Sequence, residues 1–321
     1  MPKYSSYIDF IAAYKQGEIS CEVMVNYYLE KIEAARDFNI YIDVYKEEAL
    51  ARAKALDAEA KSIGVKGRLF GTVISLKDNI CYKGKSVSAS SKILEGFTST
   101  YTATAIQKLE DEGAIIIGRV NCDEFGMGSD NSHSVYGPVK NPIDPEFVPG
   151  GSSGGCAASV LADTCLASIG TDTGGSVRQP AAFCNLVGAK PSYGQISRFG
   201  IIAYASSFDQ VGVISHQVDT VALLIDVMSG QDQMDPTTVQ KVSIKKENSE
   251  NKKYKIAYLE GTLNAKGIDP AIQEDFNKFL DKLTIDGHNV ESVPFEYMDL
   301  LVPTYYAVSY THLTLPTILL V

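Results

Sequence analysis

Residues 149–155 read PGGSSGG, and residues 170–178 read GTDTGGSVR. Each run holds a Gly-Gly-Ser turn, where the small residues let the backbone come close to a bound molecule and present a hydroxyl. These runs lie in a stretch, residues 127–200, that is rich in Gly, Ser and Thr and poor in charge. Apolar segments at 157–169 and 183–187 interrupt it, so the composition predicts a packed core and not a linker.

The second run also predicts a way to stabilise negative charge. Successive backbone N–H groups from Thr173 to Ser176 can converge on one oxygen, which is the geometry of an oxyanion hole. Spacing alone favours the alternative that both runs are anion-binding loops or merely tight loops. A serine nucleophile also needs a base. Lys77, which directly follows a short apolar strand predicted at 72–76, is the candidate, because a lysine beside a core can lose its hydration.

Outward from this centre, the sequence alternates predicted helices and strands. Ser20 is a suitable N-cap for a helix that runs to about Arg36. Further helices are predicted at 47–63, 104–112, 219–229 and 270–283, and further strands at 114–118, 254–259 and 289–293. Residues 241–253 are charged and predict a surface loop. The alternation predicts an α/β fold, with a central mixed twisted sheet flanked by helices on both faces.

Composition excludes several classes of protein. The 321 residues carry 39 acidic and 29 basic side chains, and this acidic balance argues against a protein that grips nucleic acid by itself. No apolar run is long enough to span a bilayer, and the N-terminus has no apolar signal-peptide core, which favours the cytoplasm or an organelle matrix. Walker and dinucleotide-binding patterns are absent.

The cysteines and histidines do not form a metal or disulfide pattern. No C-x-x-C pair occurs, and no histidine lies at ligand spacing from a cysteine. We therefore expect free, buried thiols in a reducing compartment. The six cysteines are Cys21, Cys81, Cys122, Cys156, Cys165 and Cys184.

The two glycine- and serine-rich runs, with Gln179-Pro180-Ala181 after them, resemble the signature of the amidase signature family. The resemblance extends from about Phe10 to about Tyr306. It implies a Ser–Ser–Lys triad. In that triad Ser176 is the acylated nucleophile, Ser152 is a bridging serine at a cis peptide bond, and Lys77 is the base. It implies no metal or organic cofactor in this chain.

The same resemblance implies the surroundings of the triad. Ser153 is expected to support it by hydrogen bonding. Asp172 and Arg178 are expected to brace the loop as an ion pair and to take no direct part in the reaction. The amides of the oxyanion hole are expected to be those of Thr173, Gly174, Gly175 and Ser176.

Four further segments resemble one branch of the family, the A subunits of tRNA-dependent amidotransferases. They read NCDEFGMGS at 121–129, FCNLVGAKP at 183–191, ASSFDQVG at 205–212 and MDPT at 234–237. The branch resemblance implies a glutaminase in a heterotrimer with B and C subunits. Its ammonia would serve the transamidation of Glu-tRNA(Gln) or Asp-tRNA(Asn). A partner subunit would use ATP and Mg²⁺ and hold most of the misacylated tRNA.

Two other functions are weighed against the glutaminase. One is a free-standing amidase for small aryl or aliphatic amides, which differs in the groups that recognise the substrate. The other is a catalytically dead structural subunit, which the presence of Lys77, Ser152 and Ser176 disfavours. Tyr136 and residues 123–127 are expected either to wall the site or to pack in an ordinary way.

The resemblance ends near Ser309. We interpret 1–308 as an incomplete amidase signature domain and 309–321 as a non-native tail. The alternative for the tail is a divergent edge strand, because Leu313 and Leu315 alternate with threonines before Pro316. The last third of the family, which carries the glutamine-recognising groups, is expected to be missing. The chain as written is therefore expected to expose sheet edge and to lack glutaminase activity alone.

Overall fold

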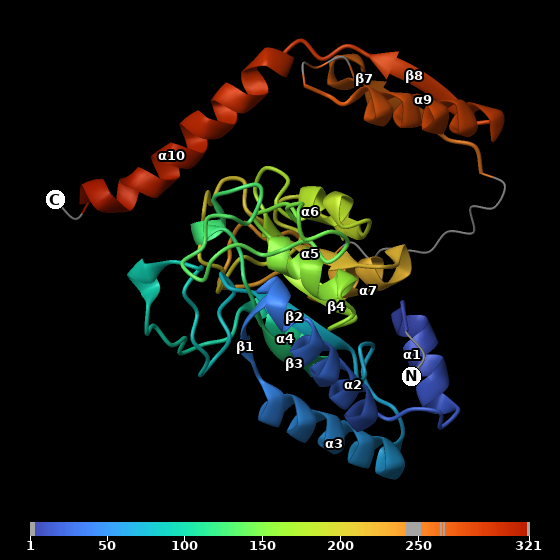
Figure 1. Cartoon of the computed structure of the whole chain (residues 1–321), viewed down its shortest axis with the longest axis vertical. Helices are drawn as coiled ribbons and strands as arrows, with labels where there is room; N and C mark the ends of the chain where they lie inside the picture. The colour runs from blue at the N-terminus through green and yellow to red at the C-terminus, as the bar shows by residue number, and fades with distance from the viewer. Residues whose placement is uncertain (1–3, 242–251, 264, 266, 320–321) are drawn as a thin grey trace. The chain divides into compact units, whose positions relative to one another are not determined.

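The computed structural model describes residues 4–241, 252–263, 265 and 267–319. The chain divides into two compact units, Met1–Ile244 and Lys245–Val321, each of which is described by itself (Figure 1). The domain boundary that the sequence predicts at residue 308 stays a prediction.

The first unit is built on a six-stranded sheet with the strand order β1-β3-β2-β4-β6-β5. Strands β3, β2 and β4 are parallel neighbours, and the outer pairs β1–β3, β4–β6 and β6–β5 are antiparallel. The strands are β1 Tyr41–Val44, β2 Val73–Lys77, β3 Ile115–Val120, β4 Ala167–Asp172, β5 Val187–Ala189 and β6 Gln210–Ser215.

Helices cover this sheet. The α-helices of the first unit are α1 Tyr7–Lys15, α2 Cys21–Ala34, α3 Lys46–Ile63, α4 Thr104–Asp111, α5 Gly154–Leu161, α6 Arg178–Phe183 and α7 Val218–Met228. Short 3-10 turns are η1 Arg36–Phe38, η2 Lys92–Leu94 and η3 Glu124–Gly126. The predicted helices at 20–36, 47–63, 104–112 and 219–229 are confirmed, with ends shifted by one or two residues.

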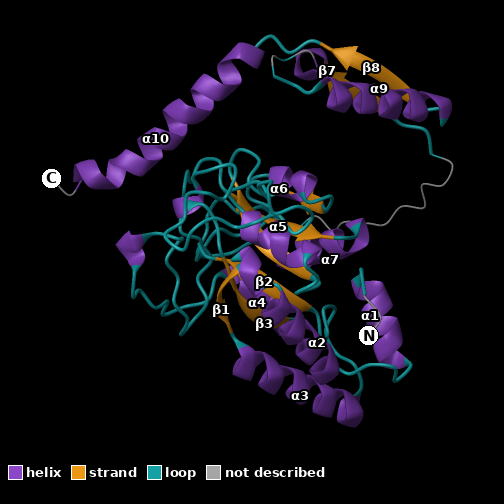
Figure 2. Ribbon diagram, viewed as in Figure 1, coloured by secondary structure: helices purple, strands orange, loops and turns teal. Residues whose placement is uncertain are grey.

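Both faces of the sheet are buried, because consecutive residues along its strands are apolar and point to opposite faces. On β3, Ile115 and Ile117 belong to a core formed with α2, α3 and α5, whereas Ile116 belongs to a core formed with α4 and α7 (Figure 2). The period of two places successive residues on opposite faces, so each face needs its own helical layer. The predicted mixed sheet with helices on both faces is confirmed.

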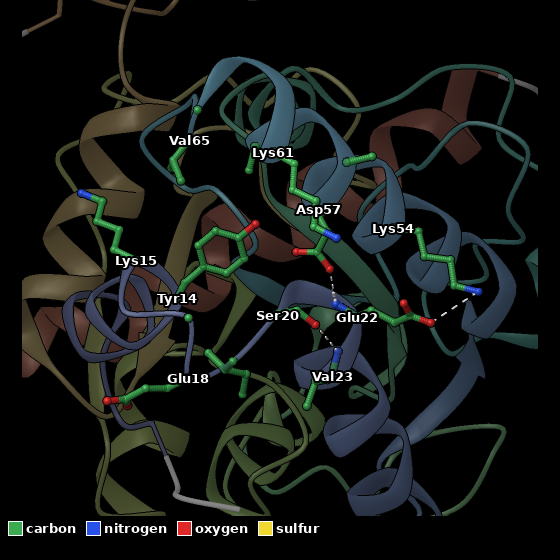
Figure 3. A pocket seen from close by; sticks show the side chains of 15 residues that line it. Tyr14, Lys15, Glu18, Ser20, Glu22, Val23, Lys54, Asp57, Lys61 and Val65 are labelled. Atoms are coloured by element: carbon green, nitrogen blue, oxygen red, sulfur yellow. Dashed lines mark hydrogen bonds and ion pairs between the residues drawn. The ribbon is translucent and has the colours of Figure 1, made fainter.

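The N-terminal helices are held together by a carboxylate. Ser20 caps α2 by accepting the Val23 N–H, and Asp57 of α3 accepts the N–H groups of Cys21 and Glu22, both at 3.0 Å. Acceptors at a helix N-terminus satisfy donors that lack a partner within the helix. Figure 3 shows Asp57 beside a surface pocket that is lined by the end of α1, the segment between α1 and α2, the start of α2 and part of α3. The pocket has a volume of about 860 Å³, and its charged side chains include Lys15, Glu18, Lys54 and Lys61.

The parallel strands decide where a site can form. Strands β2 and β4 pair with Ile74 opposite Ala167 and Leu76 opposite Ile169, so their carboxyl ends meet at one edge of the sheet. Ligand sites in such sheets lie outside the carboxyl ends of the strands. Lys77 is the last residue of β2, and the GTDTGGSVR run begins inside β4.

The second unit contains a two-stranded parallel sheet, β7 Lys255–Leu259 and β8 Asn289–Val293. Its helices are α8 Glu260–Leu263, α9 Pro270–Ile285 and α10 Leu301–Leu319, with a 3-10 turn, η4 Met298–Leu300. The strands predicted at 254–259 and 289–293 and the helix predicted at 270–283 are confirmed. Most of the predicted loop at 241–253 lies outside the described residues.

The alternative edge strand near Leu313 is wrong, because α10 includes it. The interpretation of 309–321 as a non-native tail stays a prediction. Among the described helices of both units, none is long and apolar enough to cross a membrane.

Candidate active site

Lys77 and Ser152 meet at the carboxyl edge of the sheet. Lys77 Nζ lies 2.7 Å from Ser152 Oγ, and both side chains are buried. The peptide bond between Gly151 and Ser152 is cis, as the resemblance implies. The structure therefore places the predicted base against the predicted bridging serine in hydrogen-bonding distance.

Thr171 completes the surroundings of the amine. Lys77 Nζ lies 3.0 Å from Thr171 Oγ1 and 3.4 Å from its carbonyl oxygen. Within the part of the chain that the structure describes, no carboxylate forms an ion pair with Lys77. An uncharged amine has two N–H donors and one lone pair. The two oxygens of Thr171 can take the donors, and the lone pair can accept the Ser152 hydroxyl proton.

Asn79 is a further neighbour that sequence reasoning missed. Its Nδ2 donates to Thr171 Oγ1 at 3.0 Å and to the Ile202 carbonyl at 3.3 Å. The two acceptors fix which end of the Asn79 amide faces Thr171. Asn79 lies two positions after Lys77, so its place in the Lys77-Asp78-Asn79 run was the available signal.

Ser176 lies beside Ser152 and Ser153, but its hydroxyl is not hydrogen-bonded to either of them. The Ser153 N–H donates to the Ser176 carbonyl at 3.1 Å, and Ser153 Oγ donates to the Thr171 carbonyl at 3.2 Å. Ser176 is buried, with 7% of its surface exposed. Among the described residues, its Oγ has no hydrogen-bond partner. The contact between Ser152 and Lys77 that the relay needs is thus formed, whereas no hydrogen bond joins Ser176 to Ser152 among the described residues.

The glycines explain how the two runs pack so closely. A side chain at Gly155, in the first turn of α5, would collide with the main-chain carbonyl of Asn121. The backbone of Gly175 has a φ of 124°, which side-chain-bearing residues rarely adopt. Both positions need glycine for the Ser152 and Ser176 turns to take this shape.

The predicted oxyanion hole needs one correction. The Gly175 N–H donates to Asp172 Oδ1 at 2.8 Å, so this amide is already used within the protein. The main-chain N–H groups of Thr173, Gly174 and Ser176 donate to no protein acceptor among the described residues. Gly175 is therefore not an available donor, because the Asp172 side chain bends back over the loop. Three of the four predicted amides remain available for a substrate oxygen.

Asp172 and Arg178 form the expected ion pair. Arg178 Nε and Nη2 donate to the two carboxylate oxygens at 3.0 and 2.9 Å, and the Val177 N–H donates to Oδ2 at 3.1 Å. Burial raises the pKa of the Asp172 carboxyl, but these hydrogen bonds outweigh it and hold the pKa below its ordinary value. The pair braces the loop that carries Ser176.

Asp172→Asn is expected to lower the free energy of unfolding by about 1–3 kcal/mol at pH 7, since it removes charge-assisted hydrogen bonds. A depressed carboxyl pKa stabilises the folded state above the unfolded-state value near 3.9, and this stabilisation fades as the pH falls through the folded-state value. The difference in the free energy of unfolding between wild type and variant should stay constant above about pH 5 and decrease below about pH 4. Urea unfolding at pH 7, 5 and 3.5 measures it; a gap that widens on acidification would contradict the assignment.

The loop at 123–127 contacts the triad. A Cβ placed on Gly126 would lie 3.6 Å from Ser152 Oγ and 3.8 Å from Lys77 Nζ. The expectation that this loop walls the site is therefore supported. Tyr136 is less clearly involved, because its hydroxyl pairs with Ser88 Oγ at 2.9 Å.

The cysteines near the triad are inert. All six cysteines are buried and free, as the sequence predicts. Burial raises the pKa of Cys156 to about 11 and that of Cys122 to about 12. Because only the thiolate is a good nucleophile, neither thiol competes with Ser176 at neutral pH.

One small cluster of possible metal ligands lies next to the loop. Donor atoms of Asp123, Asp130 and His133 lie within 4.8 Å of one another. The Asp123 oxygens already accept the N–H groups of Asn131 and His133 at 3.0 and 3.1 Å. These main-chain bonds account for the position of Asp123, so the cluster needs no ion to explain it.

Comparisons with known proteins find the family that the two glycine- and serine-rich runs resemble. A family model described as Amidase matches residues 23–314, which extends past the predicted boundary at 308. The chain is 42% identical over 308 residues to the A subunit of glutamyl-tRNA(Gln) amidotransferase from Chlorobium luteolum, covering 95% of this chain and 63% of that protein. It is 50% identical over 239 residues to the same-named protein from Chlorobium phaeobacteroides, covering 74% and 50%.

Solved structures show the same likeness. The A subunit of glutamyl-tRNA(Gln) amidotransferase from Thermotoga maritima matches with a TM-score of 0.81 and 36% identity, over 92% of this chain and 63% of that one. The peptide amidase of Stenotrophomonas maltophilia also matches with a TM-score of 0.81, at 27% identity, over 94% and 64%. The chain thus spans between 50% and 64% of the length of these relatives. Because the family model matches residues 23–314, the chain belongs to the amidase family.

Proposed function

We propose that this chain is the catalytic part of a glutaminase subunit of a tRNA-dependent amidotransferase. The observation that carries the proposal is the 2.7 Å contact between Lys77 Nζ and Ser152 Oγ, with Ser176 held beside that pair. The identity of 42–50% to A subunits of glutamyl-tRNA(Gln) amidotransferases supports the substrate assignment. Likeness in fold alone does not, because a peptide amidase matches with an equal TM-score.

In the acylation step, Ser176 Oγ attacks the amide carbon of glutamine. Its proton passes to Ser152 Oγ, and the Ser152 proton passes to the uncharged amine of Lys77. The amide oxygen gains the electron pair of the C=O bond and is held by free N–H groups of the loop at 173–176. The carbonyl then re-forms and the C–N bond breaks. The relay returns one proton to the nitrogen, which leaves as ammonia.

Deacylation uses the same groups in the same order. Water attacks the glutamyl ester and gives its proton through Ser152 to Lys77. The bond between the acyl carbon and Ser176 Oγ breaks, Ser176 regains a proton through the relay, and glutamate leaves. The net reaction consumes one water and one glutamine and yields glutamate and ammonia. Every step uses only side chains and amides of this chain.

We assign ATP use and most of the tRNA binding to partner subunits. We infer a heterotrimer with B and C subunits, in which a partner uses ATP and Mg²⁺ and holds most of the Glu-tRNA(Gln) or Asp-tRNA(Asn). The net charge of −10 supports this division, because tRNA binding needs basic surface. The reaction is proposed for the cytoplasm or an organelle matrix, where the six free thiols stay reduced.

The test measures ammonia release from glutamine, propionamide and benzamide by the chain alone and by an assembly in which the chain, extended to the full length of its relatives, is combined with B and C subunits. We expect release from glutamine only in the assembly, together with ATP-dependent conversion of Glu-tRNA(Gln) to Gln-tRNA(Gln). Hydrolysis of propionamide or benzamide by the chain alone, without stimulation by the partners, would favour a free-standing amidase. An assembled complex that binds glutamine and releases no ammonia would contradict both enzymatic functions.

A further inference from the structure

A second carboxylate holds the loop that carries Ser176. Thr173 is the first residue after β4, and Asp209 is the last residue before β6. The antiparallel ladder of these strands ends where Asp172 faces Gln210. Thr173 and Asp209 occupy the next position beyond that end, and there Thr173 Oγ1 donates to Asp209 Oδ1 at 2.6 Å. A side-chain hydrogen bond thus continues the ladder by one step.

Asp209 is fully engaged by groups of this chain. Only 4% of its surface is exposed. Its Oδ2 accepts the N–H groups of Tyr204 and Ala205 at 2.8 and 3.0 Å. Among the described residues, no cation forms an ion pair with Asp209. One hydroxyl and two amides therefore hold the carboxylate, and such charge-assisted bonds are short and directional.

The two carboxylates have opposite effects on the amides of the loop. Asp172 takes the Gly175 N–H for itself, whereas Asp209 takes only the hydroxyl of Thr173 and leaves its N–H free. A threonine hydroxyl without a partner can bond to main-chain groups close to it. The bond to Asp209 prevents this and fixes the residue at which the row of free amides begins.

We propose that Asp209 is a positioning residue for the oxyanion hole, which acts through the Thr173 hydroxyl to aim the Thr173 N–H at the substrate oxygen. The inference rests on the proposed function, in which Ser176 is the nucleophile. A donor aimed at charge that appears only in the transition state raises kcat and leaves KM nearly unchanged. Loss of the hydrogen bond between Thr173 and Asp209 should therefore lower kcat and leave KM nearly unchanged.

The experiment compares Thr173→Val, Thr173→Ser and Asp209→Asn in the assembly with B and C subunits, with ammonia release from glutamine as the assay. Loss of one oxyanion donor costs roughly 10²–10³ in kcat, and a displaced donor costs less. We expect Thr173→Val and Asp209→Asn to lower kcat by about 10–100-fold with KM within about twofold. Thr173→Ser keeps the hydroxyl and should stay within about threefold of wild type.

Two further readouts separate positioning from a general loss of structure. Sulfur accepts hydrogen bonds poorly, so the wild-type preference for an oxygen ester over its thiono ester should shrink in Thr173→Val; this ratio does not depend on the folded fraction. The matched control is Thr237→Val, because Thr237 Oγ1 also donates at 2.6 Å to an aspartate, Asp235 Oδ1. Thr237→Val should keep the kcat of wild type.

Three results would overturn the inference: a wild-type kcat in Thr173→Val, an unchanged oxygen-to-sulfur preference, or an equal loss in Thr237→Val. Ser176→Ala, assayed in parallel, distinguishes this failure from failure of the proposed function. Ammonia release that survives Ser176→Ala means that the function is wrong. If Ser176→Ala is inactive and Thr173→Val is as fast as wild type, only the role of Asp209 is wrong.

Discussion

Ser176→Ala is expected to abolish glutamine hydrolysis in the assembled complex, with a loss of at least about 10⁴-fold in kcat. The substitution removes the one oxygen that forms the acyl ester and changes nothing else, because Ser176 Oγ makes no hydrogen bond among the described residues. The folded state should therefore be nearly as stable as wild type. Ammonia release measures the activity, and thermal unfolding checks the fold.

A serine at the surface supplies the control for this variant. Ser62 is exposed and its hydroxyl donates to the carbonyl of Glu59, three positions earlier in the same helix, so Ser62→Ala should keep full activity. Ammonia release at the wild-type rate by Ser176→Ala would reject the triad assignment. Equal inactivation of both variants would show that the assay reports a general defect and not loss of the nucleophile.

Lys77→Met is expected to lower kcat by about 10²–10⁴-fold, the range that general base catalysis contributes. Methionine fills a similar buried volume but offers no lone pair to the Ser152 hydroxyl. The variant also leaves Ser152 Oγ without its partner, whereas Thr171 Oγ1 keeps the Asn79 amide, so a modest loss of stability of about 1–3 kcal/mol accompanies it. Single-turnover release of ammonia measures the chemical step directly.

The matched control is Lys92→Met, since Lys92 is exposed on η2 and should be replaceable without effect. Lys77→Arg is informative as well, because a guanidinium stays protonated and cannot accept the Ser152 proton. It should be as inactive as Lys77→Met although it keeps hydrogen-bond donors. Substantial activity in Lys77→Arg would mean that Lys77 acts only as a donor and that the base is another group.

Helices and strands with strong local signals could be predicted from the sequence. Ser20 marks the start of α2, and Gly64 ends α3. Strand β4 was not predicted, because Ser168 and Gly170 interrupt its apolar residues. The buried hydroxyl of Ser168 does not lack a hydrogen-bond partner, because Ser75 Oγ on β2 donates to it at 2.7 Å. A partner so distant in sequence leaves no local pattern.

The same limit applies to the site. The three triad residues and the pair of Asp172 and Arg178 could be named because motifs carry them. The error at Gly175 arose because a motif does not show that the Asp172 carboxylate folds back onto its own loop. Thr171 and Asn79 escaped notice because their roles depend on the pairing of β2 with β4.

The pairing of β2 with β4 also has a consequence for folding kinetics. The helices α2 and α3 can form from contacts close in sequence, whereas the catalytic amine meets its serine only after residue 74 has found residue 167. Contacts of such long sequence separation form slowly, because the entropy of closing the chain must be lost before they stabilise anything. Recovery of activity during refolding thus measures when β2 and β4 pair at the centre of the sheet. A chain that has already regained its native helix content can still lack activity.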